Sequence, residues 1–272
     1  MMGRAWILAA AVAAFLPATV EARAIRPPAV GSWEGNGPHG LALSFQLARR
    51  GSRLRATALA VMVPVGCPPT VRQTVTLAGT NPVYAGPRAA PPGLSRPLLS
   101  KPRTIGLTFT AAGFVVDLEG PLLNPRRAVL TMSAPAGANV ACWPHTLRFT
   151  TRPAARTAVP DGAWTGSLAS TNGVTGAIRL VVAGRGRAVT SVSFDLHCPD
   201  SGGASAYRYG PDVNGQFIRA DGTFTGPVAS SAAIAWRGRF GGEKVSGSLA
   251  NLGDPCGLGT SQGATFTATH VT

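Results

Sequence analysis

The chain has 272 residues, a formal net charge of +14, 34 glycines and 23 prolines, and only 13% of its residues are charged. This composition excludes a mainly helical protein, because the long charged side chains that favour helices are scarce. After the N-terminal region no stretch approaches ~20 uninterrupted apolar residues, which excludes a transmembrane helix in the rest of the chain.

The N-terminal segment has the three parts of a secretory signal peptide. Arg4 supplies a positive charge, residues 6–16 are apolar, and Ala22-Arg23-Ala24 provides a cleavage signal. The apolar run is too short to cross a bilayer, although an uncleaved N-terminal anchor is an alternative. We therefore predict a signal peptide over residues 1–24, cleaved near Ala24, and a secreted or periplasmic protein.

Two stretches 131 residues apart contain the same short motifs in the same order. Gly31-Ser32-Trp33-Glu34-Gly35 corresponds to Gly162-Ala163-Trp164-Thr165-Gly166, and a Cys-Pro pair follows each Trp after 34 residues. Such a fixed offset predicts a duplicated module. We expect a first module over residues 25–152, a linker over 153–160 and a second module over 161–272, with Trp33 and Trp164 in the two cores.

Alternating apolar residues predict strands in both modules. One row ends at Cys67 and the other at Cys198, and we expect both sulfur atoms to point into the core. The rows are Leu59, Val61, Val63 and Val65, and Val192, Phe194 and Leu196. The same alternation recurs in residues 114–118, 128–132, 147–150, 234–240, 244–249 and 264–267. Seven or eight short strands per module predict an all-β protein of two tandem antiparallel sandwiches or barrels.

One segment of the first module has no counterpart in the second. Residues 79–103 contain six prolines and four basic residues. Long loops of this kind inside compact domains are either functional or disordered. We expect this insertion to be disordered.

The four cysteines form one pair in each module. In an exported chain the duplication favours the disulfides Cys67–Cys142 and Cys198–Cys256. A zinc site is the alternative, because Cys142 and His145 have the spacing of half a site. No second half-site has a fitting spacing, so we predict disulfides and no metal.

Positive charge is concentrated in the first module. Residues 25–158 contain 15 basic and 3 acidic residues, whereas residues 159–272 contain 8 and 7. The candidate anion-binding residues are Arg49, Arg50, Arg53, Arg55, Arg126 and Arg127. Such clusters attract an anionic polysaccharide, a cell-wall polymer or a membrane surface, although a merely solvated basic surface is the alternative. Nucleic acid is disfavoured, because no aromatic side chains alternate with these arginines.

No catalytic motif is present. The sequence lacks Gly-x-Ser-x-Gly, His-Glu-x-x-His and a phosphate-binding Gly-rich loop, and its four histidines stand apart. We therefore predict no catalytic residues and no cofactor. The prediction is an exported, non-enzymatic binding or envelope-associated protein. The alternatives are a small-ligand carrier with a barrel interior and, third, a hydrolase without a local motif.

Two resemblances accompany these patterns. The Gly-x-Trp motifs at Trp33 and Trp164 resemble the first strand of lipocalins and avidins, which implies small-ligand barrels. The whole mature chain resembles the tandem Cys-paired β modules of exported bacterial proteins. The second module carries that pattern in Gly162-Ala163-Trp164, Gly215-Gln216-Phe217, Ser246-Gly247-Ser248-Leu249 and Thr265-Phe266-Thr267-Ala268. The first module departs from it, since it lacks Ser-Gly-x-Leu. This resemblance implies fold and export and no activity.

Overall fold

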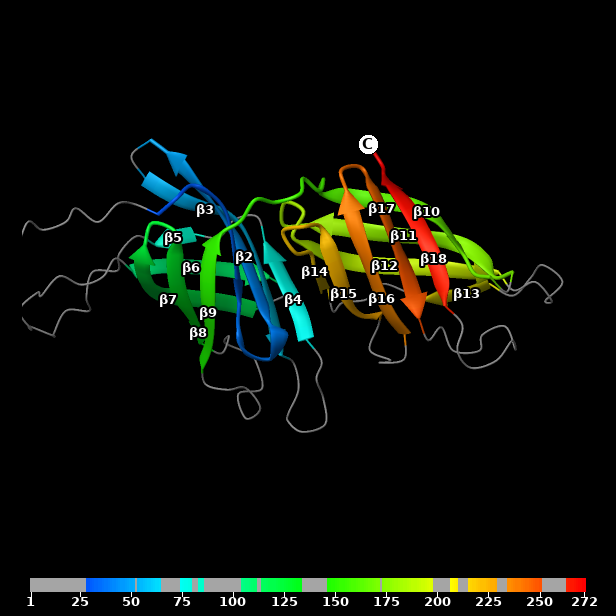
Figure 1. Cartoon of the computed structure of the whole chain (residues 1–272), viewed down its shortest axis with the longest axis horizontal. Coiled ribbons are helices and arrows are strands. Elements are labelled where there is room, and N and C mark those ends of the chain that lie inside the picture. Colours follow the sequence, from blue (N-terminus) through cyan, green and yellow to red (C-terminus); the bar gives the residue numbers. More distant parts are fainter. Residues whose placement is uncertain are drawn as a thin grey trace, which may run out of the picture.

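The chain folds into two antiparallel β-sheets in tandem, each strongly curved (Figure 1). The structure is a computed structural model. It describes residues 28–51, 53–64, 74–79, 83–85, 104–111, 114–133, 146–171, 173–197, 206–209, 215–228, 234–250 and 263–272. Residues 154–161 connect the two sheets without forming a strand.

The first sheet has nine strands in the described part of the chain. Their order across the sheet is β4-β3-β2-β1-β9-β8-β7-β6-β5. The strands are β1 (Gly31–Asn36), β2 (Ala42–Arg50), β3 (Arg53–Pro64), β4 (Thr74–Gly79), β5 (Val83–Ala85), β6 (Thr104–Ala111), β7 (Phe114–Asn124), β8 (Arg127–Ser133) and β9 (Thr146–Pro153). A 3-10 turn, η1 (Pro38–Gly40), joins β1 to β2.

The second sheet repeats this arrangement. Its order is β13-β12-β11-β10-β18-β17-β16-β15, and β14 pairs with β12 beside this path. The strands are β10 (Gly162–Ala169), β11 (Thr175–Ala183), β12 (Ala188–His197), β13 (Ala206–Tyr209), β14 (Gln216–Phe217), β15 (Thr223–Val228), β16 (Ile234–Gly241), β17 (Lys244–Ala250) and β18 (Ala264–His270).

The strand orders confirm the all-β prediction and show barrel-like sheets instead of sandwiches. In each copy the first strand pairs with both the second and the last strand, as β1 does with β2 and β9, and β10 with β11 and β18. The edges of each sheet approach one another: β3 and β4 contact β5 and β6, and β14 contacts β15. The curvature therefore nearly closes each sheet, which leaves little edge exposed.

The side chains that point inward from each curved sheet pack together and fill its interior. Leu59, Val61 and Val63 are buried as predicted, and so are Val192, Phe194 and Leu196. The two repeated tryptophans are fully buried, and each donates its indole N–H to a carbonyl four residues earlier: Trp33 to Ala29 at 2.8 Å and Trp164 to Pro160 at 3.3 Å. A buried indole N–H usually has such an acceptor. The duplicated motif thus places the same polar anchor in each core.

The first sheet is also buried on part of its outer face, which alternation did not predict. Ala42 and Ala60 point away from the first core, yet neither is exposed. They form a small apolar cluster with Phe217 of the second sheet, and Met62 and Ala78 pack against it. The second sheet therefore docks on the outside of β2 and β3, where short side chains let it approach closely.

Several sequence predictions lie outside the described residues. They are the signal peptide, both disulfides with all four cysteines, and most of the insertion at residues 79–103, of which only Gly79 and β5 are described. Within the described residues, no helix has the length and apolarity needed to cross a membrane.

Close strand contact at Gly176 generates a stability prediction. A Cβ atom there would lie 1.9 Å from the backbone oxygen of Asp195, whereas one at Gly241 would meet nothing within 4 Å. We expect Gly176→Ala to lower the free energy of unfolding by about 2 kcal/mol or more, because β11 and β12 must separate. Gly241→Ala is the control and should be nearly neutral. Equal urea midpoints for the two variants would contradict this.

Candidate functional site: an arginine-lined groove beside the junction of the two sheets

The two sheets meet at a junction that is built around a tight turn, residues 184–186, between β11 and β12. Gly184, Arg185 and Gly186 all have positive φ angles, of 71°, 58° and 70°. Both oxygens of the Asp161 carboxylate accept backbone N–H groups of this turn, from Arg185 at 2.9 Å and from Gly186 at 2.7 Å. Left-handed backbone is costly for a non-glycine residue such as Arg185, so these two hydrogen bonds hold the turn in shape.

Arg187 follows the turn and is the most deeply buried charged side chain of the described residues, at 1% exposure. One terminal nitrogen, Nη2, donates to Ser32 Oγ at 2.8 Å and to Gln46 Oε1 at 2.9 Å, both in the first sheet. The other, Nη1, donates to the carbonyls of Gly184 and Arg185. Burial lowers the pKa of Arg187 to about 9, so the guanidinium is still charged at neutral pH.

Arg156 and Glu34 form the second part of the junction. The Nη2 group of Arg156 donates to the carbonyls of Gly186 and Ile218, and its Nη1 lies 3.9 Å from Glu34 Oε2. Burial lowers the pKa of Arg156 to about 10. Burial is also the main effect on Glu34 and raises its pKa, although a hydrogen bond from the Ala220 backbone and the charges of Arg156 and Arg219 act in the opposite direction.

A groove of about 670 Å³ opens beside this junction. Three arginines line it: Arg126 and Arg127 from the β7–β8 turn, and Arg152 from β9. All three are exposed. Glu34, Asn36, Thr150 and Thr151 of the first sheet also line it, and Ala220 comes from the second. The groove thus combines three cations with one acid that burial disposes toward its neutral form.

Strand register explains why these residues meet. Glu34 on β1 lies opposite Arg152 on β9, and Ala128, next to Arg127, lies opposite Thr151. Arg152 and Arg127 therefore stand on neighbouring strands near the end of the sheet where β1 begins. The sequence offered no local signal for Arg152 or Glu34, because neither belongs to a cluster along the chain.

The other predicted anion-binding residues lie at the same end of the first sheet. Arg49 and Arg50 end β2, and Arg53 and Arg55 begin β3. Leu47 pairs with Gly31 at the start of β1, and the Ala29 N–H donates to Pro125 O in the β7–β8 turn. Both arginine clusters therefore flank the start of β1, and Arg126 and Arg127 line the groove. Arg49 is exposed.

In the described ranges, no three His, Cys, Asp or Glu residues form a group that could hold a metal ion.

The comparisons with known proteins add no family. No family model matches the chain, and no curated protein matches it. Among solved structures, the chain is similar to one titled "The Structure of Intact Ap-TbpB (N and C lobes)", at 13% identity and a TM-score of 0.24. The match covers 84% of this chain and 52% of that one, so this chain spans about half of that structure's length. At this level the likeness carries no argument.

Glu34 generates a prediction about pH. Because its pKa is raised in the folded protein, its contribution to stability is complete below the usual value of 4.5 and is lost as the pH rises through the folded-state pKa. Glu34→Gln does not titrate. We therefore expect the unfolding free energy of Glu34→Gln, relative to the original protein, to increase from about pH 4 to about pH 7.

Urea unfolding at the two pH values measures this difference. Glu243→Gln removes the same charge from an exposed turn and controls for net charge. A relative stability of Glu34→Gln that stays constant or falls as the pH rises would mean that burial does not disfavour the Glu34 carboxylate.

Proposed function

We propose that this protein is an exported, non-enzymatic binding protein whose first sheet binds an anionic polymer or surface through the groove beside the junction. The observation that carries the proposal is the convergence of Arg126, Arg127 and Arg152 on one groove. They come from the start of β8 and the end of β9, which strand pairing brings together. Arginine is suited to this role, because its planar group donates several hydrogen bonds to carboxylate, sulfate or phosphate.

The charge distribution supports the same proposal. Residues 25–158 carry 15 of the basic residues but only 3 acids. Arg49 and its neighbours at the β2–β3 turn flank the same end of the sheet, which would extend the positive field beyond the groove. A polymer or an envelope surface, with many anionic groups, would use such an extended field better than a single small anion.

The packing of the cores weighs against the alternative of a small-ligand carrier. The described inward side chains of both sheets, including Trp33, Phe45 and Trp164, are fully or almost fully buried against one another. A ligand inside a barrel needs space lined by partly exposed groups. The two hollows described in this protein lie instead on outer faces.

The proposal predicts how retention on a dextran sulfate column depends on the groove. We expect Arg126→Gln/Arg127→Gln to elute at lower salt and to bind about fivefold to thirtyfold more weakly, because two exposed cations contribute roughly 0.5 to 1 kcal/mol each. An uncharged dextran column measures retention that does not depend on charge.

Arg179→Gln/Arg237→Gln is the matched control, because it removes two exposed arginines from the second sheet. This variant should keep most of the retention. If both double variants lose retention equally, binding follows net charge alone and the groove has no special role.

A further inference from the structure

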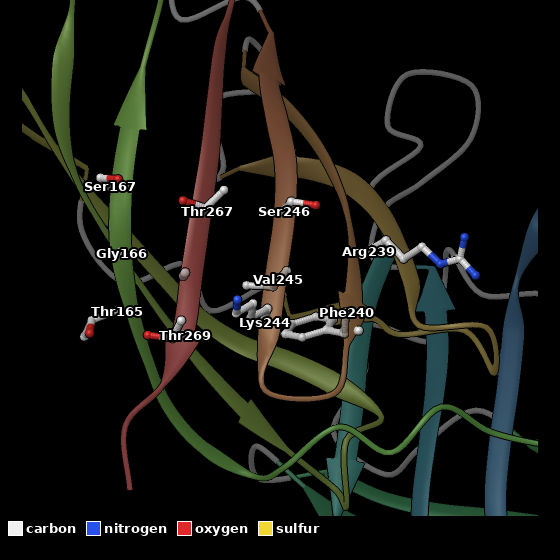
Figure 2. Close-up of a pocket in the computed structure, with 12 residues that line it drawn as sticks. Thr165, Gly166, Ser167, Arg239, Phe240, Lys244, Val245, Ser246, Thr267 and Thr269 are labelled. Carbon is white, nitrogen blue, oxygen red and sulfur yellow. The ribbon is translucent and has the colours of Figure 1, made fainter.

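A second hollow lies on the outer face of the second sheet (Figure 2). It has a volume of about 640 Å³ and spans β10, β18, β17 and β16. Hydroxyl side chains from three of these strands line it: Thr165, Ser167, Ser246, Thr267 and Thr269. Arg239 and Lys244 lie at its border, and none of the described residues that line it is acidic.

The strand register arranges these groups in two adjacent rows. Thr267 on β18 lies opposite Ser167 on β10 and Ser246 on β17. Two residues further along β18, Thr269 lies opposite Thr165 and Lys244. Neighbouring strands are about 4.8 Å apart, so each row presents three polar groups at a regular spacing.

The alternation of the strands turns these hydroxyls outward. On β18 the side chains of Phe266 and Ala268 are buried. Thr267, which lies between them, and Thr269, which follows them, are exposed. None of the five hydroxyls bonds to another group in the described part of the protein. Each can therefore both donate to and accept from a ligand, and the branched threonines lose little freedom in doing so.

The charged border gives the hollow a preference for anions. Lys244 and Arg239 are exposed, and both lie within the lining. The nearest acids belong to neighbouring turns: Glu243 precedes Lys244 in the chain, and Asp221 interacts with Arg239. Phe240 offers no ring for stacking, because its side chain is 1% exposed and packs edge-on against Trp164. A neutral sugar or a nucleobase would lack the aromatic platform that it usually needs.

We propose that this hollow binds a segment of a linear acidic polysaccharide. The rows of hydroxyls would exchange hydrogen bonds with the sugar hydroxyls, and Lys244 would face a carboxylate. Arg239 lies at the edge of the hollow, where its side chain extends away from the hydroxyls and adds positive charge (Figure 2). Such a ligand matches both chemistries of the hollow, because its hydroxyls face the hydroxyl side chains and its carboxylates face the positive charge. The inference does not rest on the junction groove, because the two sites share no residue.

Binding of polygalacturonate, a polymer of acidic sugars, tests the inference by isothermal titration calorimetry of the whole chain. We expect Thr267→Val/Thr269→Val to bind it about tenfold more weakly, because valine keeps the shape of threonine but removes two hydrogen bonds. Thr175→Val/Thr225→Val, which alters two exposed threonines outside the hollow, is the matched control and should bind as the original protein does.

Two further ligands separate the contribution of hydroxyl groups from that of charge. Dextran has hydroxyls without charge and polyphosphate has charge without hydroxyls, so we expect dextran to bind weakly and polyphosphate binding to be insensitive to the two valines. An unchanged affinity of Thr267→Val/Thr269→Val for polygalacturonate would overturn the inference. So would complete loss of that binding in Arg126→Gln/Arg127→Gln, which would assign the polymer to the junction groove alone.

Discussion

The burial of a single charged side chain couples the two halves of this protein. Removing a guanidinium from water costs several kcal/mol, and that cost is offset only if its donors find well-placed acceptors. The two terminal nitrogens of Arg187 find four, two in its own turn and two in the first sheet, whereas its buried Nε has none among the described residues. Because Ser32 and Gln46 must stand opposite the turn for this to happen, the contact fixes how the sheets meet. The groove depends on that arrangement, because Ala220 of the second sheet lines it and its backbone hydrogen-bonds to Glu34 of the first.

The two sheets share a strand framework and a core because the sequence repeats. They differ in their outer faces, which carry the candidate binding sites. Both sheets share the same order of eight strands, although β14 pairs with β12 where β5 pairs with β6, and both anchor a buried tryptophan through its indole N–H. Their outer faces differ. On the first sheet, Ala42 and Ala60 are covered by Phe217, and arginines stand at the end where β1 begins. On the second sheet, the corresponding first and last strands carry exposed Ser and Thr. A common core thus supports two different surfaces.

The inner faces were predictable from the sequence and the junction was not. Alternation identified Leu59, Val61 and Phe194 as core residues because a strand has only two faces. It could not reveal that Ala60 on the other face would also be buried, since that depends on a partner sheet. Likewise Gly-Arg-Gly at residues 184–186 has the composition of a solvated turn, and nothing local distinguishes the Arg187 that follows. Arg126 and Arg127 were found as a pair, whereas Arg152 joins them only through strand register.

A double-mutant cycle between Arg187 and Gln46 tests the central claim most directly. The free energies of urea unfolding would be measured for the original protein, Arg187→Met, Gln46→Met and the double variant. If the buried contact joins the sheets, each single variant leaves a polar partner unpaired, and the cycle should give a coupling of about 1 to 3 kcal/mol. Additive effects, with a coupling near zero, would contradict the claim that this contact holds the two sheets together.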